Sequence, residues 1–114
     1  MYGFNEVDAA TLAQWLAAGE RVRLVDVRTP GETARGVIQG AELIPLHLLP
    51  LQATAMDGAS KTVFYCQTGA RSAQACMFMA QRGDAEVYNL QGGIVAWARS
   101  GQPVVEGNRD LLRA

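Results

Sequence analysis

The sequence has few residues of the kinds that bind transition metals. It contains two cysteines, Cys66 and Cys76, and a single histidine, His47. A closed zinc site takes about four ligands from such residues, so three are too few. We therefore expect no metal at the functional site of this protein.

Strong charge and long apolar runs are also missing. The formal net charge is −1 at pH 7, which gives no reason to expect nucleic acid or an anionic membrane as a partner. No apolar run approaches the roughly 18 residues that a membrane span needs. The first residues, MYGFNEVDAA, have neither the basic start nor the apolar segment of a signal peptide. The sequence thus predicts a cytoplasmic protein, in which a structural disulfide is not expected.

The composition that remains is that of an ordinary globular domain. Of the 114 residues, 49% are apolar and 18% are charged, proportions typical of chains that bury a core. The length fits one domain, and no internal repeat or low-complexity tract interrupts it. We expect a single domain over residues 1–107 and a short C-terminal tail over 108–114.

Short apolar runs predict the strands of a sheet. VRLVDV (22–27), KTVFYC (61–66) and EVYNL (86–90) are rich in Val and aromatic residues and are apolar almost throughout. Such runs suit strands that are covered on both faces, as in a parallel sheet. Residues 41–44 and 4–7 are shorter strand candidates, which brings the expected number of strands to about five.

Helix signals fill the gaps between these runs. Asp8 can cap a helix over 9–18, and Thr29 has the capping-box spacing to Glu32. Further helices are expected over 46–55, 72–82 and 94–100. The alternation predicts an α/β fold, with a parallel sheet of about five strands flanked by helices on both faces.

The segment FYCQTGARS (64–72) places Cys66 where an apolar strand ends and small and polar residues begin. Ligands of parallel sheets bind beyond the carboxyl ends of the strands. A helix that starts near Ser72 would point its N-terminus, with its unpaired N–H groups and partial positive charge, at the same place. This location makes Cys66 a candidate nucleophile.

The residues after Cys66 suit an anion-binding loop. Gly69 and Ala70 are small enough for the backbone N–H groups to form a nest around the sulfur. Hydroxyl groups and a forked cation are added by Thr68, Ser72 and Arg71. Together they predict a thiolate whose pKa lies below the ~8.5 of a free cysteine. The alternative, a small buried apolar residue at a strand end, explains the thiol but not the residues that follow it.

The length of this loop separates two kinds of thiolate chemistry. From Cys66 to Arg71 the pattern is a cysteine, four residues and an arginine, whereas cysteine phosphatases have one more residue to wrap the oxygens of a phosphate. The shorter loop suits a single extra sulfur atom on the cysteine. In this feature the sequence resembles the rhodanese family of sulfurtransferases, which hold a cysteine persulfide in such a six-residue loop.

Two further segments extend the resemblance over residues 6–104. LVDVRTPGETARGVIQGAELIP (24–45) is similar to the upstream motif of the family, and NLQGGIVAWARSGQPV (89–104) is similar to its closing motif. The resemblance implies a rhodanese-like fold with Cys66 as the catalytic residue and with Asp26 and Arg28 in supporting roles. The implied substrate-binding residues are Gln67, Thr68, Gly69, Ala70, Arg71 and Ser72, with Arg71 positioning an anionic donor.

Three positions depart from the pattern of the family. Val37 stands where the family usually has a histidine, Thr33 where an aromatic residue is common, and Gln67 takes a position that is often basic. The change at Gln67 removes one cation from the rim of the pocket and weakens the case for thiosulfate as the natural donor. Lys61, the only lysine, lies at the other end of its strand and does not replace that cation.

For four other residues a structural role is the first interpretation. Arg28 and Glu32 are four positions apart, which favours an ion pair, with a pocket role for Arg28 as the alternative. Cys76 lies in an apolar helical pattern and is expected in the core, with a role in resolving an oxidised Cys66 as the alternative. His47 lies among leucines and is expected at the surface.

The resemblance implies a sulfurtransferase that works without a cofactor. Cys66 would take the sulfane sulfur from a small donor, thiosulfate or a persulfide, and pass it to a thiophilic acceptor, which is cyanide in an assay or a thiol, including a protein thiol, in the cell. Two other classes stay open at this point. One is a binding module that carries sulfur with little turnover of small molecules, and the other is a cysteine phosphatase or arsenate reductase, which the short loop disfavours.

Overall fold

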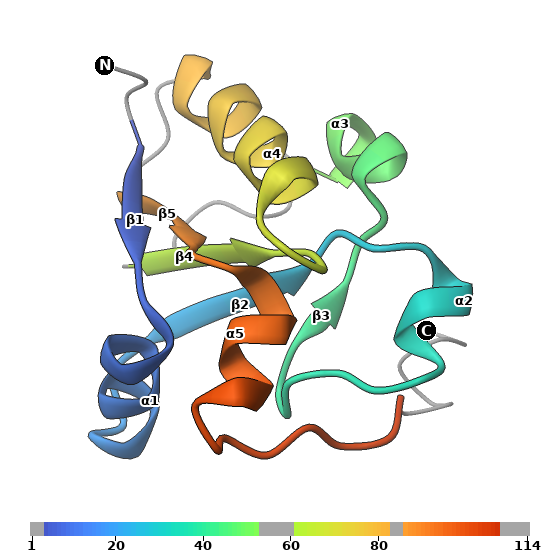
Figure 1. Ribbon diagram of the computed structural model, residues 1–114. Coiled ribbons are helices and arrows are strands. Elements are labelled where there is room, and N and C mark those ends of the chain that lie inside the picture. Colours follow the sequence, from blue (N-terminus) through green and yellow to red (C-terminus); the bar gives the residue numbers. More distant parts are fainter. Residues whose placement is uncertain (1–3, 53–60, 83–85, 108–114) are drawn as a thin grey trace.

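The computed structural model describes residues 4–52, 61–82 and 86–107, whose five strands form one parallel sheet (Figure 1). The order of the strands across the sheet is β1-β5-β4-β2-β3. Their bounds are β1 (Asn5–Val7), β2 (Val22–Asp26), β3 (Glu42–Leu43), β4 (Lys61–Tyr65) and β5 (Glu86–Leu90). Strand β4 lies at the centre, paired with β2 and β5, so the residue that follows β4 lies at the middle of the carboxyl edge.

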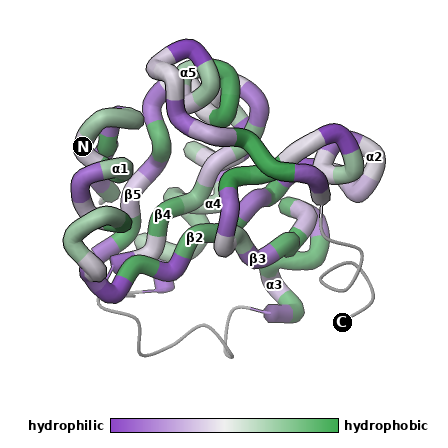
Figure 2. The backbone as a smooth tube through the Cα atoms, turned by 90° about the horizontal axis from the view of Figure 1, so that it is seen from below, coloured by the Kyte–Doolittle hydropathy of each residue, from purple (hydrophilic) through white to green (hydrophobic). Residues whose placement is uncertain are grey.

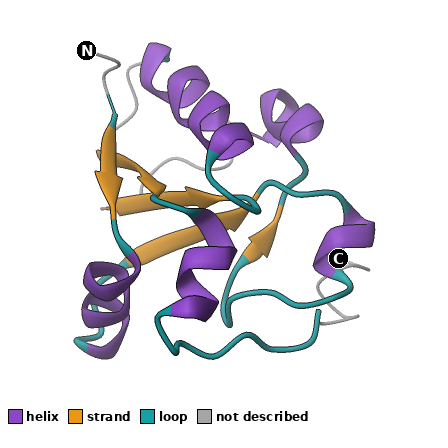
Figure 3. Ribbon diagram, viewed as in Figure 1, coloured by secondary structure: helices purple, strands orange, loops and turns teal. Residues whose placement is uncertain are grey.

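Helices cover both faces of the sheet (Figure 3). Helices α3 and α4 lie on one face, and α1 and α5 lie on the other (Figure 1). Their bounds are α1 (Ala9–Ala17), α2 (Pro30–Thr33), the 3₁₀ turn η1 (Leu46–Leu48), α3 (Leu49–Gln52), α4 (Ala70–Gln81) and α5 (Gly93–Arg99). The predicted α/β architecture is confirmed. Among the described residues, no helix is long and apolar enough to cross a membrane.

Most boundaries lie within one residue of the predicted ones, and three elements need comment. Strand β3 is only two residues long, because it is an edge strand that pairs with β2 alone. Helix α4 begins at Ala70, two residues before the predicted start, because Gly69 adopts a φ of 114° and turns the chain straight into the helix. The segment 46–55 divides into η1 and α3, and its last three residues lie outside the described part of the chain.

The alternation of side chains along the strands creates two cores. Phe64 and Cys66 pack with α3 and α4 on one face, whereas Val63 and Tyr65 pack with α1 and α5 on the other. In Figure 2, hydrophobic segments follow the central strands, and the surrounding helices carry both hydrophobic and hydrophilic residues. The sheet is therefore buried on both sides, and Cys66 belongs to the α4 face.

The hydroxyl of Tyr65 leads to a prediction about stability. Tyr65 is completely buried, and its hydroxyl oxygen accepts a hydrogen bond from the backbone N–H of Ile38 at 3.0 Å. Replacing Tyr65 by Phe leaves that N–H without an acceptor, and we expect a loss of about 1–3 kcal/mol in the free energy of unfolding. Urea unfolding followed by circular dichroism measures it.

The matched control is Tyr88→Phe, since the hydroxyl of Tyr88 donates to Glu86 at an exposed site. We expect that variant to change the free energy of unfolding by less than ~0.5 kcal/mol. Equal effects of the two substitutions would show that the Tyr65 hydroxyl does not stabilise the fold.

Candidate active site

Helix α5 fixes the backbone at the end of the central strand. The carbonyl oxygens of Cys66 and Gln67 accept hydrogen bonds from the N–H groups of Ile94 and Val95, at 2.9 and 3.2 Å. Gly93 makes this contact possible, because a Cβ atom there would lie 2.4 Å from the Gln67 carbonyl oxygen and 2.5 Å from that of Cys66. The first N–H groups of α5 are thus satisfied by Cys66, which carries the thiol, and by the residue that follows it.

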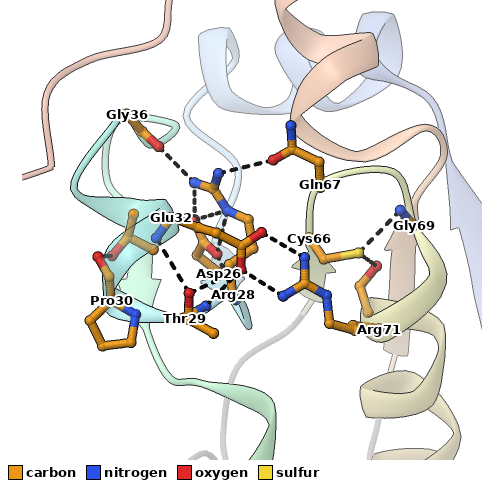
Figure 4. Close-up of polar contacts among 12 residues, drawn as sticks. Asp26, Arg28, Thr29, Pro30, Glu32, Gly36, Cys66, Gln67, Gly69 and Arg71 are labelled. Atoms are coloured by element: carbon orange, nitrogen blue, oxygen red, sulfur yellow. Dashed lines mark hydrogen bonds and ion pairs between the residues drawn. The ribbon is translucent and has the colours of Figure 1, made fainter.

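The sulfur of Cys66 lies at the N-terminus of α4 (Figure 4). The backbone N–H of Gly69 donates to this sulfur at 3.1 Å, and the hydroxyl of Ser72 lies 3.4 Å from it. Gly69 is the N-cap residue of α4 and has no side chain to satisfy the free N–H groups of the helix. These groups, and the positive end of the helix dipole, are therefore directed at the sulfur.

Asn89 of β5 holds this loop in place, a role that sequence reasoning missed. Its amide nitrogen donates to the carbonyl of Gly69 at 3.2 Å, and its amide oxygen accepts from the Ser72 hydroxyl at 2.5 Å. A hydroxyl has a single proton to donate, so Asn89 and the Cys66 sulfur compete for it. The signal in the sequence was a buried-looking strand, EVYNL, with one amide side chain.

Two opposing effects act on the thiol of Cys66, which is 1% exposed. Burial alone would raise the pKa of Cys66, because it disfavours the charged thiolate. Hydrogen bonds from the Ser72 hydroxyl and from the backbone N–H groups of Ser72, Gly69 and Thr68 outweigh burial, so the pKa of Cys66 lies below its ordinary value. The loop therefore favours an anionic sulfur.

Arg71 forms an ion pair with Glu32, a partner that the sequence did not indicate, and its predicted role toward an anionic donor stays a prediction. Its two terminal nitrogens bind the two carboxylate oxygens of Glu32 at 2.7 and 2.8 Å (Figure 4). The hydrogen bond from Arg71 lowers the pKa of Glu32 to about 2. Stability from this pair is therefore present above the ordinary Glu pKa of 4.5 and is lost only as the pH falls toward 2.

The predicted ion pair between Arg28 and Glu32 is wrong, because Arg28 pairs with Asp26. Its guanidinium binds both oxygens of the Asp26 carboxylate at 2.8–3.1 Å and also donates to the carbonyl of Gly36. Asp26 accepts a further hydrogen bond from the backbone N–H of Arg28 at 2.9 Å. Both side chains are buried. Replacing either one by a neutral residue would leave the other charge buried and unpaired, which lowers the free energy of unfolding by about 3–5 kcal/mol.

The remaining predicted residues lie around the loop without touching the sulfur through their side chains. The side chains of Thr68 and Ala70 are exposed, and the side-chain oxygen of Gln67 accepts from Arg28 at 3.3 Å. Cys76 is fully buried in the same core as Cys66, and burial raises the pKa of Cys76 well above its ordinary value. The described ranges contain no cluster of three or more His, Cys, Asp or Glu side chains that could hold a metal.

Comparisons with known proteins establish the family. The rhodanese-like domain family matches residues 8–100, and a sulfurtransferase of Allochromatium vinosum is 48% identical over 101 residues, covering 89% of this chain and 94% of the relative. The chain therefore belongs to the rhodanese-like domain family, and the resemblance seen in the sequence motifs is confirmed.

Solved structures agree on the fold. A rhodanese-related protein from Thermoplasma volcanium has a TM-score of 0.81 and 30% identity, covering 90% of this chain and 98% of that one. A protein from Rhodopseudomonas palustris, described as a possible tyrosine phosphatase, has a TM-score of 0.78 and 27% identity, covering 90% of this chain and 85% of that one. The fold is thus shared by proteins that are described differently, so the function has to be argued from the residues of the site.

The donors around the sulfur predict the titration of Cys66. We expect the rate of alkylation of Cys66 by iodoacetamide to inflect at a pH below the ~8.5 of a free cysteine. Ser72→Ala should move the inflection to higher pH, because the thiolate loses one donor. Mass spectrometry of the labelled peptide measures the rate at Cys66 alone, and Cys66→Ser should abolish that label. An inflection at the ordinary value in the parent protein would contradict the role of the N–H groups.

Proposed function

We propose that this protein is a sulfurtransferase that forms a persulfide on Cys66. The observation that carries the proposal is the sulfur of Cys66 held by the Gly69 N–H in a loop of six residues. Membership of the rhodanese-like domain family and the sulfurtransferase relative support the reaction class. We further propose the loop residues Gln67 to Ser72 as the persulfide-binding segment, with Asp26 and Arg28 as positioning residues.

The reaction proceeds in two displacements at sulfur. The Cys66 thiolate attacks the outer sulfur of thiosulfate, the S–S bond breaks, and its electron pair leaves with sulfite. The enzyme then holds a persulfide anion, so that one negative charge remains on the enzyme before and after the step. A thiophilic acceptor such as cyanide attacks the outer sulfur, and thiocyanate leaves while the Cys66 thiolate is regenerated. This is covalent catalysis without a cofactor.

The N–H groups around the sulfur suit this intermediate. They stabilise a single negative charge on sulfur and lie within hydrogen-bond distance of it. A phosphatase would need room and donors for the oxygens of a phosphate, and in this chain the arginine of the loop is bound to Glu32. That ion pair disfavours the phosphatase alternative further. A sulfur carrier with little turnover stays as the second candidate, because a carrier needs the same persulfide.

The ion pair of Arg71 predicts the effect of removing the charge of Glu32. Glu32→Gln should release the guanidinium for an anionic donor and raise kcat/KM for thiosulfate about two- to fivefold, the range expected for a partly exposed pair worth up to ~1 kcal/mol. Steady-state thiocyanate formation measures it. Because the pKa of Glu32 is about 2, the gain should be the same throughout the neutral range.

The control is Glu6→Gln, which removes the same charge from the exposed side of β1 and should leave kcat/KM unchanged. A decrease in Glu32→Gln would mean that Glu32 holds Arg71 in its working position and does not withhold it from the donor.

Loop length provides the test of the proposed function itself. Inserting one glycine between Gly69 and Ala70 separates the Gly69 N–H from the start of α4 and widens the loop. We expect sulfur transfer to fall about tenfold or more, because donors stabilise an anion only within hydrogen-bond distance. Mass spectrometry after incubation with thiosulfate shows whether Cys66 gains the mass of one sulfur atom.

The matched control is a glycine inserted after Gly19, in the exposed turn that follows α1, which should load sulfur like the parent. If the parent gains no sulfur from thiosulfate or from a persulfide, the proposed function fails. If the parent is loaded once but produces no thiocyanate in excess of the protein, the carrier is the better description. Equal loading of the parent and the Gly69 variant would refute the argument from loop length alone.

A further inference from the structure

A surface pocket of about 470 Å³ lies next to the loop of Cys66. One wall is formed by the side chains of α5, and the others by residues around α2 and by Val104. Its volume lies in the range of sites for small organic molecules, about 300–1,000 Å³. A small inorganic ion such as thiosulfate would leave most of it unfilled. The pocket therefore fits a larger, organic ligand.

The charges in this pocket do not cancel. Arg28 is paired with Asp26, and Glu32 is paired with Arg71. Arg35 is exposed, lines the pocket, and makes no side-chain hydrogen bond or ion pair within residues 4–52, 61–82 and 86–107. One positive charge is thus available to a ligand, opposite an apolar wall.

The pocket is coupled to the thiol through shared residues. Ile94 and Val95 line it with their side chains, while their N–H groups bind the carbonyl oxygens of Cys66 and Gln67. Gln67, which follows the nucleophile directly, also lines the pocket, and so does Glu32, the partner of Arg71 in the loop (Figure 4). A molecule in the pocket therefore contacts Gln67, the residue directly after Cys66, and the residues of α5 that bind the Cys66 loop.

We propose that this pocket binds the organic part of a small thiol and of its persulfide, with Arg35 pairing with a carboxylate of that molecule. The inference rests on the proposed sulfur transfer and names its substrate class. With a persulfide R–S–SH as donor, the Cys66 thiolate attacks the outer sulfur and the S–S bond breaks. The electron pair leaves with the thiolate R–S⁻, and the proton stays on the transferred sulfur. The apolar wall on α5 contacts the hydrocarbon part of R.

Binding of an unreactive analogue tests the pocket independently of chemistry. The probe is S-methylglutathione, which has two carboxylates and no free thiol, titrated into the parent protein and followed by NMR. Arg35→Gln should weaken binding about three- to tenfold, as expected for the loss of one charge-assisted hydrogen bond in a partly solvated pocket. The diethyl ester of the probe, which lacks the carboxylates, should bind the parent about as weakly as the acid binds Arg35→Gln.

Two further variants separate charge from shape. Arg99→Gln removes an exposed charge of the same sign from α5 outside the pocket lining, and it should leave the affinity for the probe unchanged. Ala98→Phe places a ring in the pocket from an exposed position on α5, and it should weaken binding of the acid and of the ester alike. Equal affinity of the parent and Arg35→Gln for the acid, or absence of binding to the parent, would overturn the proposal.

Kinetics then connect the pocket to sulfur transfer. With glutathione persulfide as donor, Arg35→Gln and Ala98→Phe should raise KM about three- to tenfold, with a much smaller effect on kcat. The rise in KM should be clearly larger with this donor than with thiosulfate, which is too small to fill the pocket. If loading of Cys66 with sulfur succeeds but both donors respond equally, the subsite is refuted and the proposed function stands. If no donor loads Cys66, the proposed function fails, whatever the probe does.

Discussion

A thiolate that is removed from water requires hydrogen-bond donors in place of the water it loses, and this constraint organises the structure around Cys66. Desolvation of an ion costs several kcal/mol, whereas one hydrogen bond to a charged group contributes about 1.5–3 kcal/mol. A single donor is therefore not enough. The parallel sheet provides a solution, because the chain leaves the carboxyl end of β4 and enters α4 within four residues, so that several unpaired N–H groups meet at one point.

The charged side chains near this point neutralise one another in pairs. Asp26 balances Arg28, and Glu32 balances Arg71, so the backbone dipoles are the main source of positive potential at the sulfur. Such an arrangement suits a species with a single negative charge, like a persulfide. It is poorly suited to the dianion of a phosphate ester, which requires a free arginine to bind its oxygens. The pairing of charges thus agrees with the loop length in favouring sulfur transfer over phosphate chemistry.

The features that depend on residues close together in the chain were predictable from the sequence. The strand positions follow from apolar runs, the capping box of Thr29 from its spacing to Glu32, and the cradle from the residues after Cys66. The partners of Glu32 and Ser72 were not predictable in this way. Glu32 binds Arg71 across 39 positions and Ser72 binds Asn89 across 17, whereas helical spacing suggested only the wrong partner, Arg28. These contacts depend on the order of the strands, which brings β5 and α2 to the carboxyl end of β4.

The backbone of helix α5 supports the Cys66 loop, whereas residues of the same helix line the neighbouring pocket. Its first N–H groups bind the carbonyls of Cys66 and Gln67, which requires helical backbone and the close approach at Gly93 but no particular side chains after it. Its side chains at Ile94, Val95 and Ala98 line the neighbouring pocket. In the proposed subsite, a substitution at the exposed Ala98 would therefore change the ligand without moving the nucleophile, whereas Ile94 also belongs to the core. The same holds for Arg35, whose side chain contributes charge to the pocket and has no part in the hydrogen bonds that hold the Cys66 loop. Under the proposed function, a fold built in this way keeps one persulfide chemistry while its donors and acceptors differ.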